Sequence, residues 1–331
     1  MSQPKQHHYL PKNALLRFFE SQEKQDFLWM YQRGEEPIFT NKNNIAKEKH
    51  LYSFANKDGS YNTELESALA EMEDVVSPII ERLNNATQQI IITPQEKSEL
   101  SYFLAMQVVR TPGFRALLKK QAAEMAKLHM QMLASNKEAF AHSLKKVQEE
   151  NPNTPEVSVE EMQDFVLDDS KYTIEMGNED YFLKQAVELG DHIYPAIMMK
   201  DIFILKSKSV EFITSDYPVA LISDPAVPPF YGGGFLLSGF LIPIGTHTAL
   251  FCKNPEEPKE PPKQGEDVLV PYNDVSPAHV EWANEVAIKR AERFLFNATK
   301  DLEVKNKFDK TSPPERFHMS SPFSKKESNN S

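Results

Sequence analysis

Helical spacing of apolar residues dominates the first half of the chain. After Asn62 and Thr63, apolar side chains recur every three or four residues, which is the pattern of a helix with one buried face. The stripe comprises Leu65, Leu69, Met72, Val76, Ile79 and Leu83. Pro78 lies inside this pattern, where an interior proline costs about 3 kcal/mol. We therefore expect a kink or a break at Pro78.

A second apolar stripe predicts another helix that begins at Thr93. Thr93 is a good N-cap, and Pro94 suits the first helical position because no amide partner is needed there. The buried stripe comprises Leu100, Phe103, Leu104 and Val108. The pattern is interrupted at residues 111–113 (Thr-Pro-Gly) and resumes over 114–150, which carries many lysines and several methionines.

The pattern changes character further along the chain. Residues 151–155 (Asn-Pro-Asn-Thr-Pro) are a strong linker signal, and helices are expected over 158–167 and 179–199. An early hairpin is expected over 27–40. After Lys200, short apolar runs alternate with turn residues, which indicates a small antiparallel sheet. These runs are 201–207, 210–214, 219–222, 240–244 and 248–252.

Together these segments predict an α+β fold, with a mainly helical body and a small antiparallel sheet in the C-terminal half. We expect a single compact domain over residues 1–300. Its helical part covers about 62–199, its sheet about 200–255, and a closing helix about 277–297. Residues 301–331 are rich in Lys, Ser, Asn and Pro, so we expect a disordered tail there.

Composition narrows the classes of function. The 331 residues carry 37 Lys and Arg against 48 Asp and Glu, a formal net charge of −11. An extended face for duplex nucleic acid is therefore not expected, although a local basic pocket is compatible with this balance. Cys252 is the single cysteine and is expected in the core. No stretch offers the roughly 20 apolar residues of a membrane span, so we expect a cytoplasmic protein.

Helical geometry turns several polar side chains toward the interior. Gln107 and Arg110 lie on a mainly apolar face of the second helix, and Asn284 lies on the buried face of the last one. Glu66 and Glu73 flank the apolar stripe of the first helix. Burying a charge or an amide costs free energy unless the group is paired, so these residues indicate either partners or a site.

Three further residues complete the candidate site. Asp216, preceded by Ser215, ends a predicted strand, which suits a catalytic carboxylate and equally a turn residue that binds its own backbone. His8 is a candidate base or metal ligand because imidazole titrates near neutral pH, or else it fastens the N-terminal segment by hydrogen bonds. A base, a cation, carboxylates and amides are the groups of a site that handles phosphoryl or acyl groups. An Arg110 ion pair that only holds the fold together explains the same residues.

Short boxes of residues resemble a mostly bacterial family known as domain of unknown function 4238. Residues 7–11 (His-His-Tyr-Leu-Pro) resemble its N-terminal His-Tyr-Val-Pro box. Residues 107–112 (Gln-Val-Val-Arg-Thr-Pro) resemble its Gln-x-x-Arg-Thr-Pro box, and 214–219 (Thr-Ser-Asp-Tyr-Pro-Val) its Ser-Asp-Asn-Pro-Val box. Glu66 and Glu73 match its paired glutamates. The resemblance covers most of the chain and implies a fold and candidate positions, but no activity.

Two hypotheses follow. In the first, the chain is an enzyme with a polar pocket at the junction of helices and sheet, a hydrolase or nuclease of the toxin or phage-defence kind. Its substrate contains phosphate and is a small molecule or a nucleic acid, and a divalent metal is left open as a cofactor. The catalytic candidates are His8, Glu66, Glu73, Arg110 and Asp216, and the substrate-binding candidates are Gln107, Ser215 and Asn284.

In the second hypothesis the chain is a non-catalytic interaction module. The inward polar residues then hold the fold together, and the helical region 114–150 binds a partner protein or a second copy of the chain. The two hypotheses differ in whether the polar side chains surround an open cavity or pair with one another in a closed interior.

Overall fold

The computed structural model describes residues 6–151, 157–223, 234–257 and 260–314. Contacts between residues divide the chain into two compact units. The larger runs up to Arg115 and resumes at Asp180, and the smaller comprises Ala116–Glu179. The smaller unit is therefore an insertion in the sequence of the larger one. The expectation of one compact domain over residues 1–300 does not anticipate this division.

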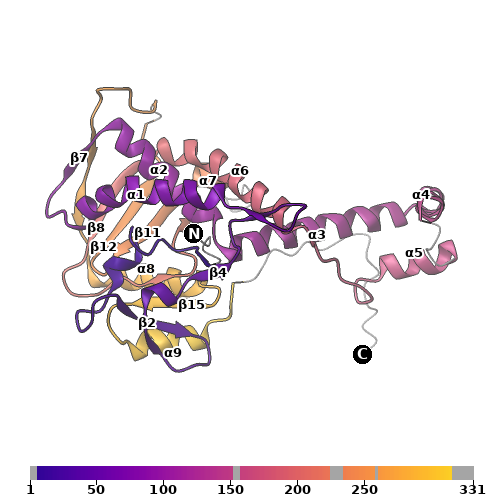
Figure 1. Cartoon of the computed structure of the whole chain (residues 1–331), viewed down its shortest axis with the longest axis horizontal. Coiled ribbons are helices and arrows are strands. Elements are labelled where there is room, and N and C mark those ends of the chain that lie inside the picture. The colour runs from indigo at the N-terminus through magenta and orange to yellow at the C-terminus, as the bar shows by residue number, and fades with distance from the viewer. Residues whose placement is uncertain (1–5, 152–156, 224–233, 258–259, 315–331) are drawn as a thin grey trace. The chain divides into compact units, whose positions relative to one another are not determined.

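Helices predominate and short strands form small, mainly antiparallel sheets, so the predicted α+β fold class is confirmed (Figure 1). The helices of the larger unit are α1 (Glu64–Asn84), α2 (Pro94–Val109), α6 (Glu179–Met198), α7 (Gly234–Leu237), α8 (Pro277–Arg290) and α9 (Leu302–Lys310). Two 3-10 turns cover Leu16–Phe19 and Lys42–Asn44. Helix α3 (Pro112–Ala134) continues into the smaller unit, which also contains α4 (Lys137–Glu150) and α5 (Val159–Leu167).

The first two long helices follow the signals in the sequence, with one exception. Helix α2 begins after Thr93, whose side chain accepts the amide of Glu96 while the Glu96 carboxylate accepts the amide of Thr93. This reciprocal arrangement satisfies two amides that the first turn of a helix leaves unpaired. Helix α1, in contrast, continues through Pro78. Of the expected kink or break, the break does not occur, because tertiary packing of an apolar stripe outweighs one lost backbone hydrogen bond.

The smaller unit has its own apolar core. Ala134 of α3, Phe140 of α4 and Val166 of α5 are buried against one another. The region 114–150, predicted as one continuous helical pattern, is divided between α3 and α4. The division falls at Asn136, whose side chain accepts the amide of Ala139 and so starts the second helix.

A five-stranded sheet forms the centre of the larger unit. Its strands, in spatial order, are β10 (Ala220–Ile222), β11 (Gly239–Gly245), β12 (Thr248–Lys253), β8 (Asp201–Lys206) and β14 (Tyr272–Asp274), antiparallel except for the β8–β14 pair. All residues of β11 are buried, so both faces of the sheet are covered. Leu241 and Ala249 pack on Val280 of α8. Cys252 alternates to the other face and is buried within reach of Lys97 on α2, which confirms it as a core residue.

A second, four-stranded sheet joins the two ends of the chain. Its strands, in spatial order, are β3 (Ile38–Asn41), β2 (Phe27–Gln32), β15 (Phe294–Asn297) and β9 (Thr214–Ser215). The expected hairpin over 27–40 is thus β2 with β3. The predicted closing helix over 277–297 is wrong at its C-terminal end, because α8 ends at Arg290 and the Phe-Leu-Phe run of β15 pairs with β2 instead.

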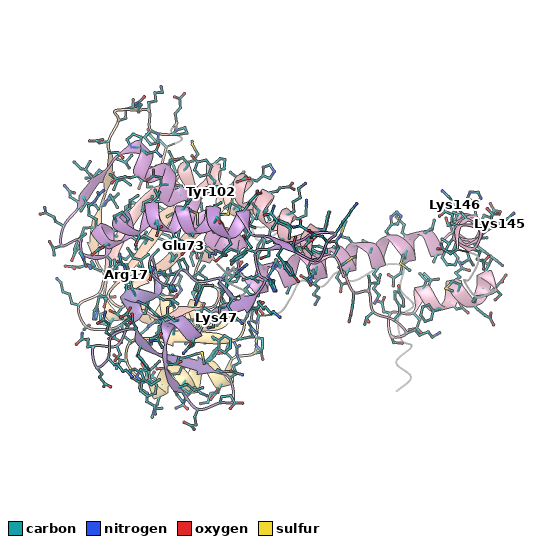
Figure 2. All side chains as sticks on the ribbon, viewed as in Figure 1. Arg17, Lys47, Glu73, Tyr102, Lys145 and Lys146 are labelled. Carbon is teal, nitrogen blue, oxygen red and sulfur yellow. The ribbon has the colours of Figure 1, made fainter. Side chains whose placement is uncertain are left out.

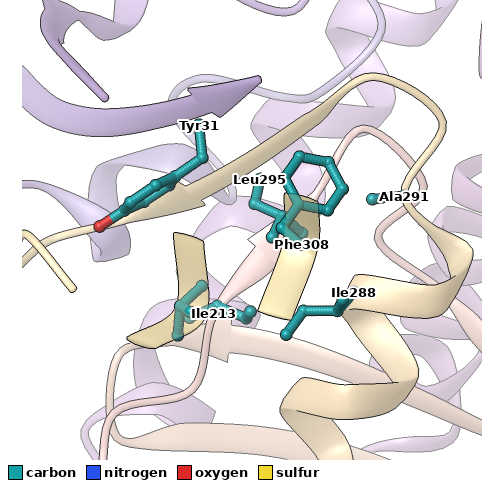
Figure 3. Packing of buried hydrophobic residues seen from close by; sticks show 7 residues of the cluster. Tyr31, Ile213, Ile288, Ala291, Leu295 and Phe308 are labelled. Atoms are coloured by element: carbon teal, nitrogen blue, oxygen red, sulfur yellow. The ribbon is translucent and has the colours of Figure 1, made fainter. Parts of the chain in front are cut away.

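A buried cluster beside this sheet shows that part of the expected tail is ordered. Phe308 and Val304 of α9 pack against Tyr31, Ile288 and Leu295, as Figure 3 shows for most of the cluster. The prediction of a disordered tail from residue 301 is therefore wrong for α9, whose apolar side chains complete this core. Residues 315–331 of the predicted tail lie outside the described residues.

Three pairs of very short strands complete the larger unit. They are β1 (Gln6–His8) with β4 (Lys47–Lys49), β7 (Ile90–Ile92) with β13 (Val268–Val270), and β5 (Phe54–Ala55) with β6 (Tyr61–Asn62). Runs of two or three residues carry no usable period, so the sequence did not predict them. Within the described ranges, no helix has the length and apolar character of a membrane-crossing segment.

Candidate functional site

Arg110 lies at the meeting point of three elements of the larger unit. It directly follows α2, and its side chain is almost entirely buried, with 4% exposed. Its Nη1 donates to Glu73 Oε1 on α1 at 2.7 Å, and its Nη2 donates to the carbonyl of His8 on β1 at 2.7 Å. The structure therefore brings together three of the predicted site residues, Arg110, Glu73 and His8, although His8 contributes its backbone to this contact.

Tyr52 completes the surroundings of Arg110. The buried Tyr52 hydroxyl donates to the carbonyl of Arg110 at 2.8 Å and accepts from its Nε at 3.2 Å. Burial opposes the charge of Arg110, but Tyr52 and Glu73 more than offset it and raise the pKa of Arg110. Each guanidinium nitrogen already has a partner, so in this structure Arg110 fastens α1, α2 and β1 to one another.

His7 was not among the predicted site residues, yet it lies inside this cluster. It is fully buried, its Nδ1 accepts the backbone amide of Tyr52 at 3.0 Å, and its ring stacks on that of Tyr52 at 6.0 Å between centroids. The signal that could have found both residues was their place in the sequence, because His7 precedes His8 in the first box and Tyr52 precedes the first long helix. Neither residue lies on a periodic element, so helical geometry could not select it.

Glu66 differs from the other members of the cluster in having a buried, unpaired carboxylate oxygen. Its Oε2 lies 3.7 Å from His7 Nδ1 and is buried without a hydrogen-bond partner. Burial raises the pKa of Glu66 to about 7; Arg110 works in the opposite direction, and Glu73 adds to the rise. Because His7 Nδ1 already accepts a backbone amide, it has no proton to offer Glu66, and the neutral form of the carboxyl is favoured further.

His8 carries an imidazole that stays neutral. Its pKa is lowered to about 4, mainly by burial and also by the nearby Lys12, Lys47 and Arg110, while a hydrogen bond with the backbone of Ile45 acts in the opposite direction. Its Nδ1 is buried without a hydrogen-bond partner. Lys47 lies opposite His8 in the β1–β4 pair. At neutral pH His8 is therefore an uncharged hydrogen-bonding group in a positively charged setting.

Asp216 lies next to the turn after α8, where it binds backbone amides. It is buried, its Oδ1 accepts the amide of Glu292 at 2.9 Å, and its Oδ2 accepts the amides of Arg293 and Phe294 at 2.7 and 3.1 Å. Burial raises the pKa of Asp216 to about 6, although these three amides favour its charged form. Asp216 thus fastens the turn between α8 and β15.

Asn284 and Ser215 also satisfy the backbone. Asn284 Oδ1 accepts the amide of Ile213 at 3.0 Å, and its Nδ2 donates to the carbonyl of Glu211 at 2.8 Å. The Ser215 hydroxyl bonds both the amide and the carbonyl of Tyr217. Among the described residues, no hydrogen bond or ion pair connects Asp216, Asn284 or Ser215 with the cluster around Arg110.

Gln107 lies one helical turn before Arg110 and is fully buried. Neither atom of its amide has a hydrogen-bond partner within the described part of the chain. Leaving such a group unpaired costs about 1–3 kcal/mol. Gln107 therefore remains a candidate for contact with a ligand or a water, but the structure assigns it no partner.

Access to the cluster is from the side of α1. Behind Arg110, a cavity of only about 10 Å³ lies between Tyr52, Met106 and Val109, which is space for one water at most. The Glu66 and Glu73 side chains are 27% and 20% exposed. Figure 2 labels Glu73 on α1 and Lys47 on β4. A ligand would therefore meet Glu66 and Glu73 first.

A larger hollow, of about 450 Å³, lies in the smaller unit between α3 and residues 173–176. Two of its lysines are already paired, Lys119 with Glu179 and Lys127 with Asp169. None of the predicted site residues lines it. Across the described residues, no three His, Cys, Asp or Glu side chains are grouped so that they could hold a metal ion.

Comparison with known proteins identifies a family but no activity. A family model described as "Protein of unknown function (DUF4238)" matches residues 6–301, which agrees with the resemblance of the sequence boxes. No curated protein and no solved structure matches the chain. The site geometry is therefore the basis on which a function can be argued.

Proposed function

Because this chain belongs to the DUF4238 family of proteins of unknown function, whose description names no reaction, we propose a function from the site itself. The protein is a hydrolase that acts on a phosphate-containing substrate, with Glu66 as its acid–base residue. The observation that carries this proposal is that one Glu66 oxygen is buried without a hydrogen-bond partner.

The two glutamates of α1 support this assignment because their environments differ. Glu73 is tied to Arg110 by an ion pair of 2.7 Å, whereas burial raises the pKa of Glu66 to about 7. Two carboxyl groups of which one is held in an ion pair and the other is buried without one are typical of acid–base pairs in enzymes. A pKa near the working pH lets a carboxyl both give and take a proton.

The remaining residues of the cluster position the reaction. Arg110 and Tyr52 hold α1 against β1 and so fix the distance between Glu66 and His8. We assign to the neutral His8 imidazole the orientation of a water molecule by a hydrogen bond. In hydrolysis that water attacks phosphorus, the bond to the leaving oxygen breaks, protonated Glu66 gives its proton to that oxygen, and the proton released by the water returns to solvent.

The proposal is tested by turnover of simple phosphate esters, for example the p-nitrophenyl mono- and diesters. Glu66→Gln keeps the shape and removes the transferable proton, so we expect kcat to fall about 10²–10⁴-fold while the fold is retained. Glu71→Gln is the matched control, since Glu71 is an exposed glutamate on the same helix. Full activity of Glu66→Gln, or no turnover of either ester by the unaltered protein, would contradict the proposal.

A second candidate function is the non-catalytic interaction module. The observation that favours it is the exposure of Met125, Met130 and Met132 on α3, since flexible methionines are common at protein-binding surfaces. The fully paired Asp216 and Asn284 are also compatible with it. Concentration-dependent self-association that Met125→Gln together with Met132→Gln abolishes would favour this candidate over an enzyme that acts alone.

A further inference from the structure

Two lysines beside His8 lack the partners that other buried lysines have. Lys47 lies directly opposite His8 in the antiparallel β1–β4 pair, and directly opposed residues project their side chains from the same face of a sheet. Lys12 follows four residues after His8, and both ammonium groups lie close enough to influence the imidazole. Two lysine side chains thus lie near His8.

The other half-buried or buried lysines show what is missing. Lys42 pairs with Glu20 and Asp26, and Lys305 pairs with Asp309. Lys206 donates to backbone and hydroxyl oxygens. In the described ranges, no hydrogen bond or ion pair is found for Lys12 or Lys47, although neither side chain is fully exposed. Both ammonium groups are therefore available to an anion, with which a charge-assisted hydrogen bond can form.

Nearby carboxylates do not neutralise the two lysines. Glu48, the neighbour of Lys47, pairs with Arg293 at 2.7 Å. Glu73 pairs with Arg110, which already balances its charge. The local excess of positive charge stands out in a chain whose formal net charge is −11. The buried Nδ1 of His8, which also has no hydrogen-bond partner, lies near these cations and is a further polar atom that a ligand could bond.

We propose that Lys12 and Lys47 bind the terminal phosphate of the substrate beside His8. This inference rests on the proposed function and makes its substrate class narrower. A dianionic terminal phosphate matches two point charges in one small area. The backbone of a nucleic acid instead needs cations along an extended path.

Direct binding of inorganic phosphate, followed by calorimetry at low and moderate salt, tests the inference without turnover. We expect Lys12→Gln and Lys47→Gln each to weaken phosphate binding about 10- to 100-fold, as expected when one charged hydrogen bond is lost. The matched control is Lys289→Gln, because Lys289 is an exposed lysine of α8. It should bind like the unaltered protein. Melting temperatures of all variants show that the comparison is between folded proteins.

A second arm identifies the kind of phosphate. A dinucleotide with a 5′-terminal phosphate should displace inorganic phosphate, and the same dinucleotide without that phosphate should not. Equal displacement by both, unchanged binding by the two lysine variants, or no binding of phosphate by the unaltered protein would overturn the inference.

Failure of this inference and failure of the proposed function give different results. Glu66→Gln should still bind phosphate, because Glu66 transfers a proton and does not hold the anion. Phosphate binding that is lost in the lysine variants while Glu66→Gln remains active would sustain the anion site and reject Glu66 as the acid–base residue. The reverse pattern would reject the anion site alone.

Discussion

At the scale of single residues, hydrogen-bond partners separate Glu66 from Arg110, Asp216 and Asn284. The polar atoms of Arg110, Asp216 and Asn284 are paired with named groups, whereas one Glu66 oxygen is buried and unpaired. Paired groups stabilise the fold. A buried group with a shifted pKa and no hydrogen-bond partner is a candidate for a functional site. Residue type alone could not make this distinction, because Glu66 and Glu73 are chemically identical.

The raised pKa of Glu66 predicts how stability depends on pH. The carboxyl of the unfolded chain loses its proton near 4.5 and that of the folded protein near 7. Between these values the folded state binds more protons, so the free energy of unfolding falls as the pH rises. This contribution is fully present below the lower value and is lost above the higher one. At about 1.4 kcal/mol for each pKa unit, the loss is roughly 3 kcal/mol.

Glu66→Gln tests this dependence because it cannot ionise. Urea denaturation should show the variant gaining stability relative to the unaltered protein as the pH increases from about 5 to about 8. Glu71→Gln, on the exposed side of the same helix, should show no such gain. A stability difference that is the same at both pH values would mean that Glu66 is ordinarily solvated in the folded protein.

At the scale of elements, a few polar side chains determine how helices and strands are joined. Arg110 ties α2 to α1 through Glu73 and to β1 through the His8 carbonyl. Asn284 ties α8 to residues 211–213, and Asp216 holds the turn before β15. These contacts satisfy backbone groups that would otherwise be buried without partners. The candidate site is therefore built on connections that also stabilise the fold.

Arg110→Ala should consequently destabilise the protein as well as change the site. Removing one partner of a buried ion pair costs about 3–5 kcal/mol, because the other charge is left without compensation. Arg82→Ala is the matched comparison, since Arg82 forms an ion pair with Glu96 while 45% of its side chain is exposed. It should cost less than about 1 kcal/mol. Equal costs in denaturant titrations would show that Arg110 is not closed off from water.

At the scale of the whole molecule, residues from both ends of the sequence build the larger unit. Its four-stranded sheet places β2 next to β15, and α9 covers the cluster that contains Tyr31 and Leu295. The smaller unit is inserted between Arg115 and Asp180 and has a separate core. Stability of the larger unit therefore depends on the segment after residue 301, which the composition had suggested was disordered.

Phe308→Ala tests the contribution of α9. Phe308 is fully buried in the cluster, so its truncation should lower the free energy of unfolding by about 3–5 kcal/mol. Lys310→Ala at the exposed end of the same helix should change it by less than about 0.5 kcal/mol. If urea denaturation shows equal small effects, α9 is not packed as described.

The sequence by itself determined the long helices and the inward positions on them. The Leu65–Leu83 stripe defined α1, and Thr93 defined the start of α2, because helical period and capping depend only on neighbours along the chain. The same local geometry selected Glu66, Glu73 and Arg110, which the structure brings into one cluster. The family boxes supplied His8, which has no period to reveal it.

Only the tertiary structure decided which of these polar groups are paired. The β1–β4 pair joins residues about 40 positions apart in the sequence. Strand β15 pairs with β2, from which it is separated by most of the sequence. Partners so distant leave no periodic trace in a single sequence. The same is true of burial, which raises the pKa of Glu66 and gives Asp216 its three amide contacts. The pKa values and hydrogen bonds of these groups depend on loss of water and on distant partners, and both arise only when the chain has folded.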